Sequence, residues 1–237
     1  MTAALTANAL EAGYGDIRVV GPIDLEIGAG EVVCLLGANG AGKTTTMMTL
    51  AGVLAPLAGT ITLLGDDIGG QQPHKIAALG LTLVPEDRGI FYQLTVAENL
   101  RLRRQHTSEI TETQLFEYLP DLESLQSRKA GLLSGGEQQM LALGGALLGG
   151  PSVLLIDEMS HGLAPIIVRH LLPLVRRIAD ETGMGVLLVE QHVSAALDVS
   201  DRGYVLQRGQ IVAEGTAIAI AHAARSLEDS YLGTTDT

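Results

Sequence analysis

The fold of this chain is decided by Gly37-Ala38-Asn39-Gly40-Ala41-Gly42-Lys43-Thr44, eight residues that fit the phosphate-binding pattern G-x-x-x-x-G-K-[ST]. An apolar run at 32–36 predicts a buried strand before this loop, and residues 45–50 predict a helix after it. Glycines let the backbone curl so that successive N–H groups face an anion, and the positive end of the helix dipole points to the same place. The Lys43 ammonium can reach the outer phosphates and the Thr44 hydroxyl can bind Mg²⁺. The sequence therefore predicts a site for a nucleoside triphosphate.

A second apolar run, Val153–Ile156, ends in two carboxylates, Asp157 and Glu158. Neighbouring residues of a strand face opposite sides, but the chain turns at the end of a strand, so both carboxylates can serve one site. A Mg²⁺·triphosphate needs one carboxylate for the metal, and hydrolysis needs another group to orient the attacking water. We therefore predict that Asp157 binds the metal and that Glu158 orients the water.

The remaining pattern indicates an α/β chain. It predicts antiparallel strands within 7–25, a strand at 60–64, helices over 94–148, a helix at 166–180, a strand at 186–189 and a hairpin over 204–212. Strands that are separated by helices pair in parallel, and their sites lie at the carboxyl ends of the strands.

Composition limits the class of protein. A chain of 237 residues can form one large domain or two small lobes. The net charge of −12 argues against a nucleic-acid partner, because phosphate contacts need clustered Lys and Arg. The hydrophobic content of 46% indicates that a partner covers part of the surface. We find no run that would span a membrane and no signal peptide, so we expect a cytoplasmic protein, and the single Cys34 is expected to pack in a strand.

A third motif, Leu133-Ser134-Gly135-Gly136-Glu137-Gln138, precedes a predicted helix. Ser134 fits an N-cap, and the two glycines permit close approach of the backbone to an anion. The motif resembles the signature of ATP-binding-cassette (ABC) ATPases, and loop, signature and acidic strand occur in that family's order over essentially the whole chain. The resemblance implies an ABC-type P-loop ATPase with a RecA-like core and an antiparallel β subdomain at about 1–71 and 150–237, and a helical lobe at about 72–149.

The resemblance also implies roles for further residues. Tyr14 matches the aromatic residue that stacks on adenine, and Glu86 occupies the Q-loop position, where most members have a Gln that contacts Mg²⁺. The stretch 161–164 (His-Gly-Leu-Ala) matches the D-loop, which meets the opposite subunit. The spacing favours Gln191 as the sensor of the γ-phosphate, whereas His192 requires a shift of one residue, so both stay candidates.

The expected site is therefore as follows. We expect catalysis by Glu158, Gln191 and His192, and Mg²⁺ binding by Thr44, Glu86 and Asp157. ATP should contact Tyr14, Gly37, Ala38, Asn39, Gly40, Ala41, Gly42, Lys43, Thr44, Thr45, Ser134, Gly135, Gly136 and Glu137.

Four stretches resemble the smaller ATPase of branched-chain amino-acid importers: 85–91, 94–100, 163–165 and 189–191. This resemblance implies hydrolysis of ATP to ADP and phosphate at the cytoplasmic face of the cell membrane. The implied partners are two transmembrane permease subunits, a second ABC ATPase (a paralogue or a second copy) in a head-to-tail dimer and, indirectly, a periplasmic or extracellular solute-binding protein.

Other functions stay open. Relatives of that subunit power uptake of urea or short amides, and a weakly hydrolysing nucleotide-binding regulatory cassette is a further alternative. A cassette that acts on ribosomes or DNA would predict two cassettes, coiled-coil insertions or basic patches, and the sequence shows none of them.

Three departures from the family bear on activity. Gly144 and Gly145 stand where relatives usually have Ala and Arg, and two glycines inside a helix cost roughly 1 kcal/mol each relative to Ala. Met159 replaces the proline that usually follows the catalytic Glu, which we expect to loosen a turn. Pro173 lies inside a predicted helix and is expected to kink or end it.

Overall fold

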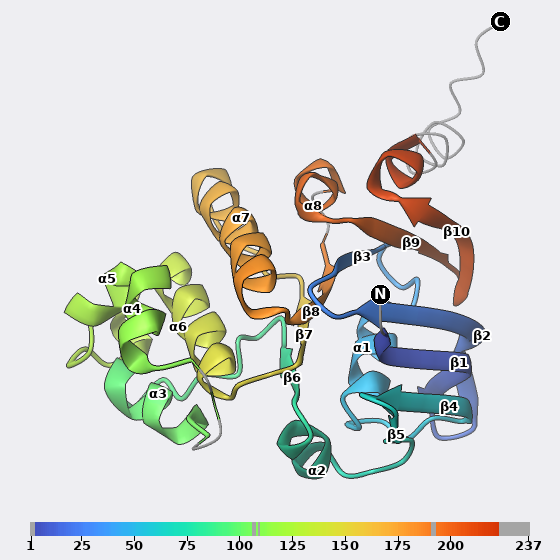
Figure 1. The fold of residues 1–237 in the computed structure, drawn as a ribbon, viewed down its shortest axis with the longest axis horizontal. Helices are drawn as coiled ribbons and strands as arrows, with labels where there is room; N and C mark the ends of the chain where they lie inside the picture. The colour runs from blue at the N-terminus through green and yellow to red at the C-terminus, as the bar shows by residue number, and fades with distance from the viewer. Residues whose placement is uncertain (1–2, 106–107, 109, 191–192, 223–237) are drawn as a thin grey trace, which may run out of the picture.

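The computed structural model describes residues 3–105, 108, 110–190 and 193–222. Figure 1 shows an antiparallel sheet beside a mostly parallel core sheet, with a group of helices standing on the far side of the core sheet. Among the described residues, no helix is both long enough and apolar enough to cross a membrane.

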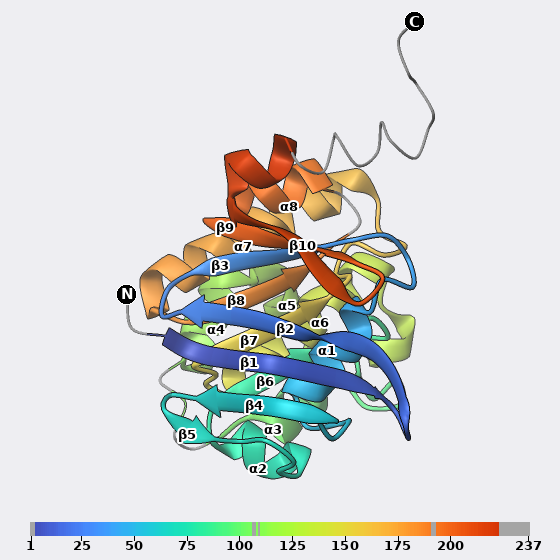
Figure 2. The ribbon, with the colours of Figure 1, turned by 90° about the vertical axis from the view of Figure 1, so that its right-hand side faces the viewer.

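The antiparallel sheet has the strand order β2-β1-β4-β5. Its strands are β1 (Ala3–Tyr14), β2 (Ile17–Gly28), β4 (Ala58–Leu63) and β5 (Asp66–Asp67). The expected antiparallel strands within 7–25 are confirmed, and they belong to two strands of twelve residues each. In Figure 2 this sheet lies in front of the core sheet.

The core sheet has the order β10-β9-β3-β8-β7-β6. Its strands are β3 (Val32–Leu36), β6 (Leu81–Val84), β7 (Val153–Asp157), β8 (Gly185–Val189), β9 (Arg202–Gln207) and β10 (Gln210–Thr216), and all neighbours pair in parallel except β9 with β10. Every residue of β3, β7 and β8 is buried, as expected for parallel strands that are covered on both faces. The parallel arrangement confirms the prediction from the sequence and places the ends of β3 and β7 at one edge, on either side of β8.

Alternate residues of β3 belong to two separate cores. Cys34 packs on the side that continues into α7 and α6, whereas Val33 and Leu35 pack with the antiparallel sheet and α1. Helix α1 (Lys43–Leu50) contacts β1, β2 and β7, so it is held between the two sheets. This position fixes the direction in which the N-terminus of α1 points.

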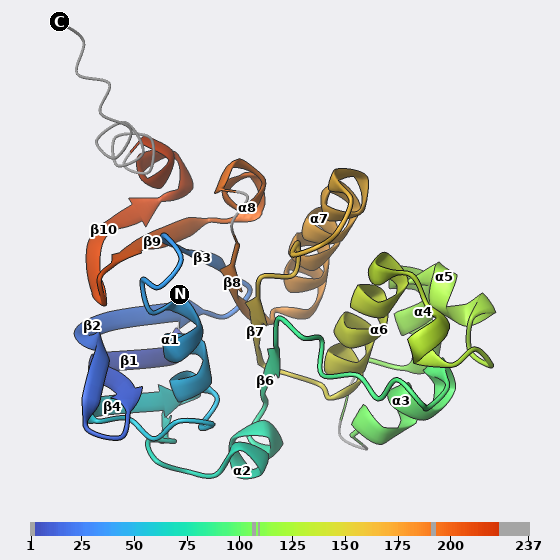
Figure 3. The same ribbon diagram turned by 180° about the vertical axis from the view of Figure 1, so that it is seen from behind.

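The remaining helices flank the core sheet or stand apart from it. α2 (Pro73–Ala78), α7 (Pro165–Thr182) and α8 (Val193–Val199) adjoin the core sheet. The separate group contains α3 (Val96–Arg103), α4 (Glu112–Tyr118), α5 (Pro120–Ser124), the 3-10 turn η1 (Ala130–Leu132) and α6 (Gly135–Leu148). Figure 3 shows α7 between this group and the sheet. The group begins at α3, because β6, which precedes it within 72–149, pairs with β7 in the core sheet.

The structure explains two of the three departures from the family pattern, at Pro173 and at Gly144-Gly145. Helix α7 runs from Pro165 to Thr182 without ending at Pro173, so the expectation that the proline ends the helix is wrong. A Cβ on Gly144 would lie 3.2–3.4 Å from three leucine methyl groups, and a Cβ on Gly145 would lie 3.2 Å from Cγ of Arg103. Both glycines therefore leave room for side chains that pack against α6.

Candidate functional site

The phosphate loop links β3 to α1 and needs glycine at two positions for different reasons. Gly42 has φ 110°, which only glycine adopts without strain, and it begins α1 without a side-chain cap. A Cβ at Gly37 would lie 2.3 Å from the carbonyl oxygen of Leu206 on β9. The first-turn amides of α1 have no acceptor within the helix, so the loop can offer them to an anion.

Lys43 is the buried cation of the loop. Its Nζ donates to the carbonyl oxygens of Gly37 (2.9 Å) and Ala38 (3.3 Å), and it lies 3.8 Å from Oε1 of Glu158. The side chains of Lys43 and Glu158 are only 5% and 10% exposed. The loop ammonium and the predicted water-orienting carboxylate are thus adjacent in the folded chain.

These two groups face a cavity of about 320 Å³. It is lined by Val19, Asn39, Gly40, Gly42, Lys43, Thr44, Thr45, Glu86, Glu158 and His161. The structure therefore brings together predicted residues from the phosphate loop, the Q-loop position and the end of β7.

Asp157 is the last residue of β7 and lies buried beside the cavity. Burial raises the pKa of its carboxyl, a hydrogen bond with the Thr44 side chain lowers it, and the charges of Glu158 and Glu86 raise it further. Within the described part of the chain, Oδ1 of Asp157 is buried without a hydrogen-bond partner. A carboxylate oxygen without a donor next to a threonine hydroxyl fits Mg²⁺, which prefers oxygen ligands.

Glu158 stands in a strained turn. Its φ of 48° lies in the left-handed region, which costs a non-glycine residue roughly 1–2 kcal/mol. The Glu158 N–H donates to the carbonyl oxygen of Val189 on β8 (2.9 Å), and the His161 N–H donates to the carbonyl oxygen of Glu158 (3.0 Å). Met159 is buried. The turn is closed by hydrogen bonds and anchored in the core, so the expected loosening at Met159 is not seen.

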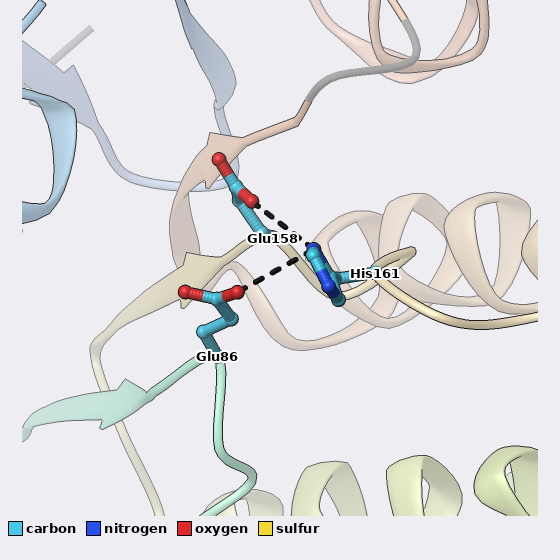
Figure 4. A group of neighbouring side chains, drawn as sticks. All are labelled: Glu86, Glu158 and His161. Carbon is cyan, nitrogen blue, oxygen red and sulfur yellow. Dashed lines mark ion pairs between the residues drawn. The ribbon is translucent and has the colours of Figure 1, made fainter. Parts of the chain in front are cut away.

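Glu86 and His161 complete the rim of the cavity (Figure 4). Nδ1 of His161 lies 3.4 Å from Oε1 of Glu86 and 3.6 Å from Oε2 of Glu158. Glu86 follows β6, while Glu158 and His161 follow β7, and these strands are neighbours in the sheet. Strand order therefore decides that the three side chains meet.

Other predicted residues do not line this cavity. Tyr14 ends β1 with its side chain half exposed, Gly37, Ala38 and Ala41 contribute the body of the loop, and the signature residues 134–137 begin α6 in the separate helical group. Ser134 is the N-cap as predicted, and it forms a capping box with Glu137. Gln191 and His192 lie outside the described residues.

The sequence reasoning missed two polar residues near the site. Buried Glu190 accepts hydrogen bonds from the backbone N–H of Ser160 (3.1 Å) and from its hydroxyl, so it joins the end of β8 to the turn after Glu158. An acidic residue directly after the apolar run at 186–189 is the same signal that identified Asp157. Arg88 gives no such local signal, because its partners lie on α6.

Comparisons with known proteins agree with this geometry. The family model described as ABC transporter matches residues 20–161. The high-affinity branched-chain amino acid transport ATP-binding protein BraG of Pseudomonas aeruginosa is 40% identical over 224 residues, covering 93% of this chain and 95% of that protein. The lipopolysaccharide export system ATP-binding protein LptB of Escherichia coli is 34% identical over 224 residues, covering 92% of each.

The fold also matches a solved structure. A nucleotide-free ATP-binding cassette from an ABC transporter superposes with a TM-score of 0.83 at 24% identity, covering 98% of this chain and all of that one. At this identity the match shows the arrangement of strands and helices alone.

Proposed function

Because this chain belongs to the ABC transporter family, whose ATP-binding cassettes power transport by hydrolysing ATP, we propose that it is the ATPase subunit of a branched-chain amino-acid importer. The proposal of ATP hydrolysis rests on one observation: Lys43 and Glu158 lie next to each other beside the uncapped N-terminus of α1. An ammonium, a helix N-terminus and a carboxylate around one cavity supply what transfer of a phosphoryl group to water requires.

The residues around the cavity have separate roles in hydrolysis. The loop amides and Lys43 hold the β- and γ-phosphates, which replace the carbonyl oxygens of Gly37 and Ala38 as partners of Nζ. Phosphate also competes with Glu158 for Lys43, so that the carboxylate turns to the attacking water and accepts its proton. Thr44, Asp157 and Glu86 would hold Mg²⁺. Bound there, Mg²⁺ would supply positive charge against the negative charge that develops on the phosphate oxygens during transfer.

A second copy or a paralogue completes the site. The residues 134–137 begin α6 in the separate helical group, away from the cavity of their own chain. In a head-to-tail dimer these residues, which lie at the N-terminus of α6, would cover the γ-phosphate bound by the partner. Closure of the dimer around ATP would then be transmitted to two permease subunits through the helical lobe, α3 to α6.

The choice of solute rests on the relatives. BraG is a branched-chain amino-acid transport protein, and LptB belongs to lipopolysaccharide export. The higher identity to BraG and the stretches 85–91 and 163–165 support import of branched-chain amino acids, with a solute-binding protein outside the membrane. Hydrolysis by the assembled complex that rises with leucine-loaded binding protein would support this solute, and stimulation by a lipid cargo instead would refute it.

The catalytic proposal is tested by Glu158→Gln. The variant should bind MgATP as the parent does and release phosphate more slowly by about 10²–10⁴-fold, the usual contribution of a positioned acid–base group. Glu117→Gln changes an exposed carboxylate on α4 and serves as the matched control. Unchanged turnover in Glu158→Gln would remove Glu158 from the mechanism.

A further inference from the structure

Three side chains at the mouth of the cavity form a mixed nitrogen and oxygen donor set. They are Glu86, Glu158 and His161, and one donor atom from each lies within 4.8 Å of the other two (Figure 4). The phosphate loop does not contribute to this set. His161 is also distinct from the oxygen donors expected for Mg²⁺, because an imidazole suits zinc and the later first-row metals.

The spacing fits a tetrahedral metal ion. Zinc bonds to nitrogen and oxygen are about 2.0–2.2 Å long, so two ligand atoms of a tetrahedral site lie about 3.4 Å apart. Nδ1 of His161 lies 3.4 Å from Oε1 of Glu86 and 3.6 Å from Oε2 of Glu158. The side chain of Glu86 is 49% exposed, so it can close the remaining distance to Glu158 by rotating in solvent.

The two oxygens of Glu158 have separate partners. Oε1 lies 3.8 Å from Nζ of Lys43, while Oε2 faces His161. A metal on Oε2 therefore leaves the contact with Lys43 in place. Two carboxylates and a neutral imidazole balance the charge of a divalent cation, and the adjoining cavity of about 320 Å³ admits water as a fourth ligand.

From this geometry we propose that the nucleotide-free chain binds one zinc-class divalent metal ion through Oε1 of Glu86, Oε2 of Glu158 and Nδ1 of His161. The ion binds next to the phosphate loop but not through it. One consequence rests on the proposed function: a metal that holds Glu158 withdraws this carboxylate from the attacking water, so zinc should suppress ATP turnover.

Binding is tested without nucleotide, so that its outcome is independent of ATPase activity. Untagged protein is titrated with Zn²⁺ against a chromophoric chelator, and we expect one equivalent to bind per chain. A large excess of Mg²⁺ should leave this equivalent in place, since imidazole favours zinc over magnesium. Co²⁺ in the same site should give the intense visible absorption of a four-coordinate ion.

Variants separate this site from other surface donors. His161→Ala and Glu86→Gln should each weaken Zn²⁺ binding by at least about 100-fold, because even second-shell partners of a metal contribute about 10–100-fold. His170→Ala and His74→Ala remove exposed imidazoles elsewhere and should keep the affinity of the parent. Circular dichroism and the melting temperature show whether each variant is folded.

Two results would overturn the proposal. One is the absence of a stoichiometric zinc equivalent in the folded parent protein. The other is a zinc affinity that His161→Ala and Glu86→Gln leave unchanged, which would assign the ion to other residues. If zinc binds as expected but Glu158→Gln still hydrolyses ATP, the metal site stands and the proposed role of Glu158 falls.

Discussion

Arg88 joins the segment after β6 to the first turns of α6 by donating from Nη1 to Oε1 of Gln138 at 2.6 Å. Its Nε also donates to Oε1 of Gln139 at 3.3 Å. Arg88 itself has φ 67°, a conformation that costs a non-glycine residue roughly 1–2 kcal/mol. The segment that carries Glu86 is thus tied to the helix that begins with the signature residues.

This link predicts coupled effects on stability. Arg88→Ala and Gln138→Ala should each lower the free energy of unfolding, and the double variant should lose less than the sum, because each single variant already breaks the same charge-assisted hydrogen bond. We expect a coupling energy of about 1 kcal/mol for such neighbours. Urea denaturation of the four proteins measures it. Losses that add to within about 0.3 kcal/mol would show that the two side chains do not interact.

Replacing the Asp157 carboxylate should stabilise the folded chain but remove its activity. A carboxyl whose pKa is raised by folding holds its proton more tightly in the folded chain, so its ionised form costs stability at neutral pH. Asp157→Asn should therefore raise the melting temperature of the nucleotide-free protein at pH 7 by roughly 2–4 °C for each 1 kcal/mol gained, and should abolish Mg²⁺-dependent turnover.

The gain in stability of Asp157→Asn should depend on pH, because it reflects the cost of ionising the Asp157 carboxyl in the folded chain. The cost of ionisation appears as pH rises from the ordinary value of 3.8 through the raised pKa, so the advantage of Asp157→Asn should vanish as pH falls towards 3.8. Thermal denaturation between pH 4 and pH 7 follows it, with Glu117→Gln as the exposed control. A lower melting temperature of Asp157→Asn at pH 7 would contradict this assignment of the raised pKa.

The adjacent glycines of α6 should respond differently to the same substitution. In Gly145→Ala the new Cβ meets Cγ of one side chain, Arg103, at 3.2 Å, so a shift of a few tenths of an ångström relieves the contact and the helix should gain up to about 1 kcal/mol. In Gly144→Ala the new Cβ meets the methyl groups of Leu115, Leu119 and Leu122, which are packed in the core. Overpacking costs typically 1–3 kcal/mol, so this variant should be less stable than Gly145→Ala. Chemical denaturation compares the two, and the reverse order would refute the packing argument.

The single cysteine should report global unfolding. Burial raises the pKa of the Cys34 thiol to about 11, and a hydrogen bond between the thiol and the Ser200 side chain opposes part of the rise. At pH 8 only about 0.1% of such a thiol is ionised, and the thiolate is the reactive form. The folded protein should therefore resist a disulfide reagent that labels the urea-unfolded chain completely. Rapid stoichiometric labelling of the native protein would mean that Cys34 is accessible.

Local spacing was enough to predict the phosphate loop, the acidic end of β7 and the N-cap at Ser134. Each of these features is made by residues that are adjacent along the chain, so backbone geometry and neighbouring hydrogen bonds determine it. The loop needs its glycines in series, and the capping box joins Ser134 to Glu137 within one turn. The alternation of strands and helices likewise predicted the parallel core sheet.

Only the tertiary structure decided which separate segments meet. The order β3-β8-β7-β6 places Lys43 beside Glu158 and brings Glu86, after β6, to His161, after β7. Packing of the helical group against α7 and the sheet brings Arg88 into contact with Gln138 of α6. The same packing places the stem of Arg103 against Gly145. These contacts depend on sheet order and on the complementary shapes of packed side chains, which residues far apart in the chain create only when it folds.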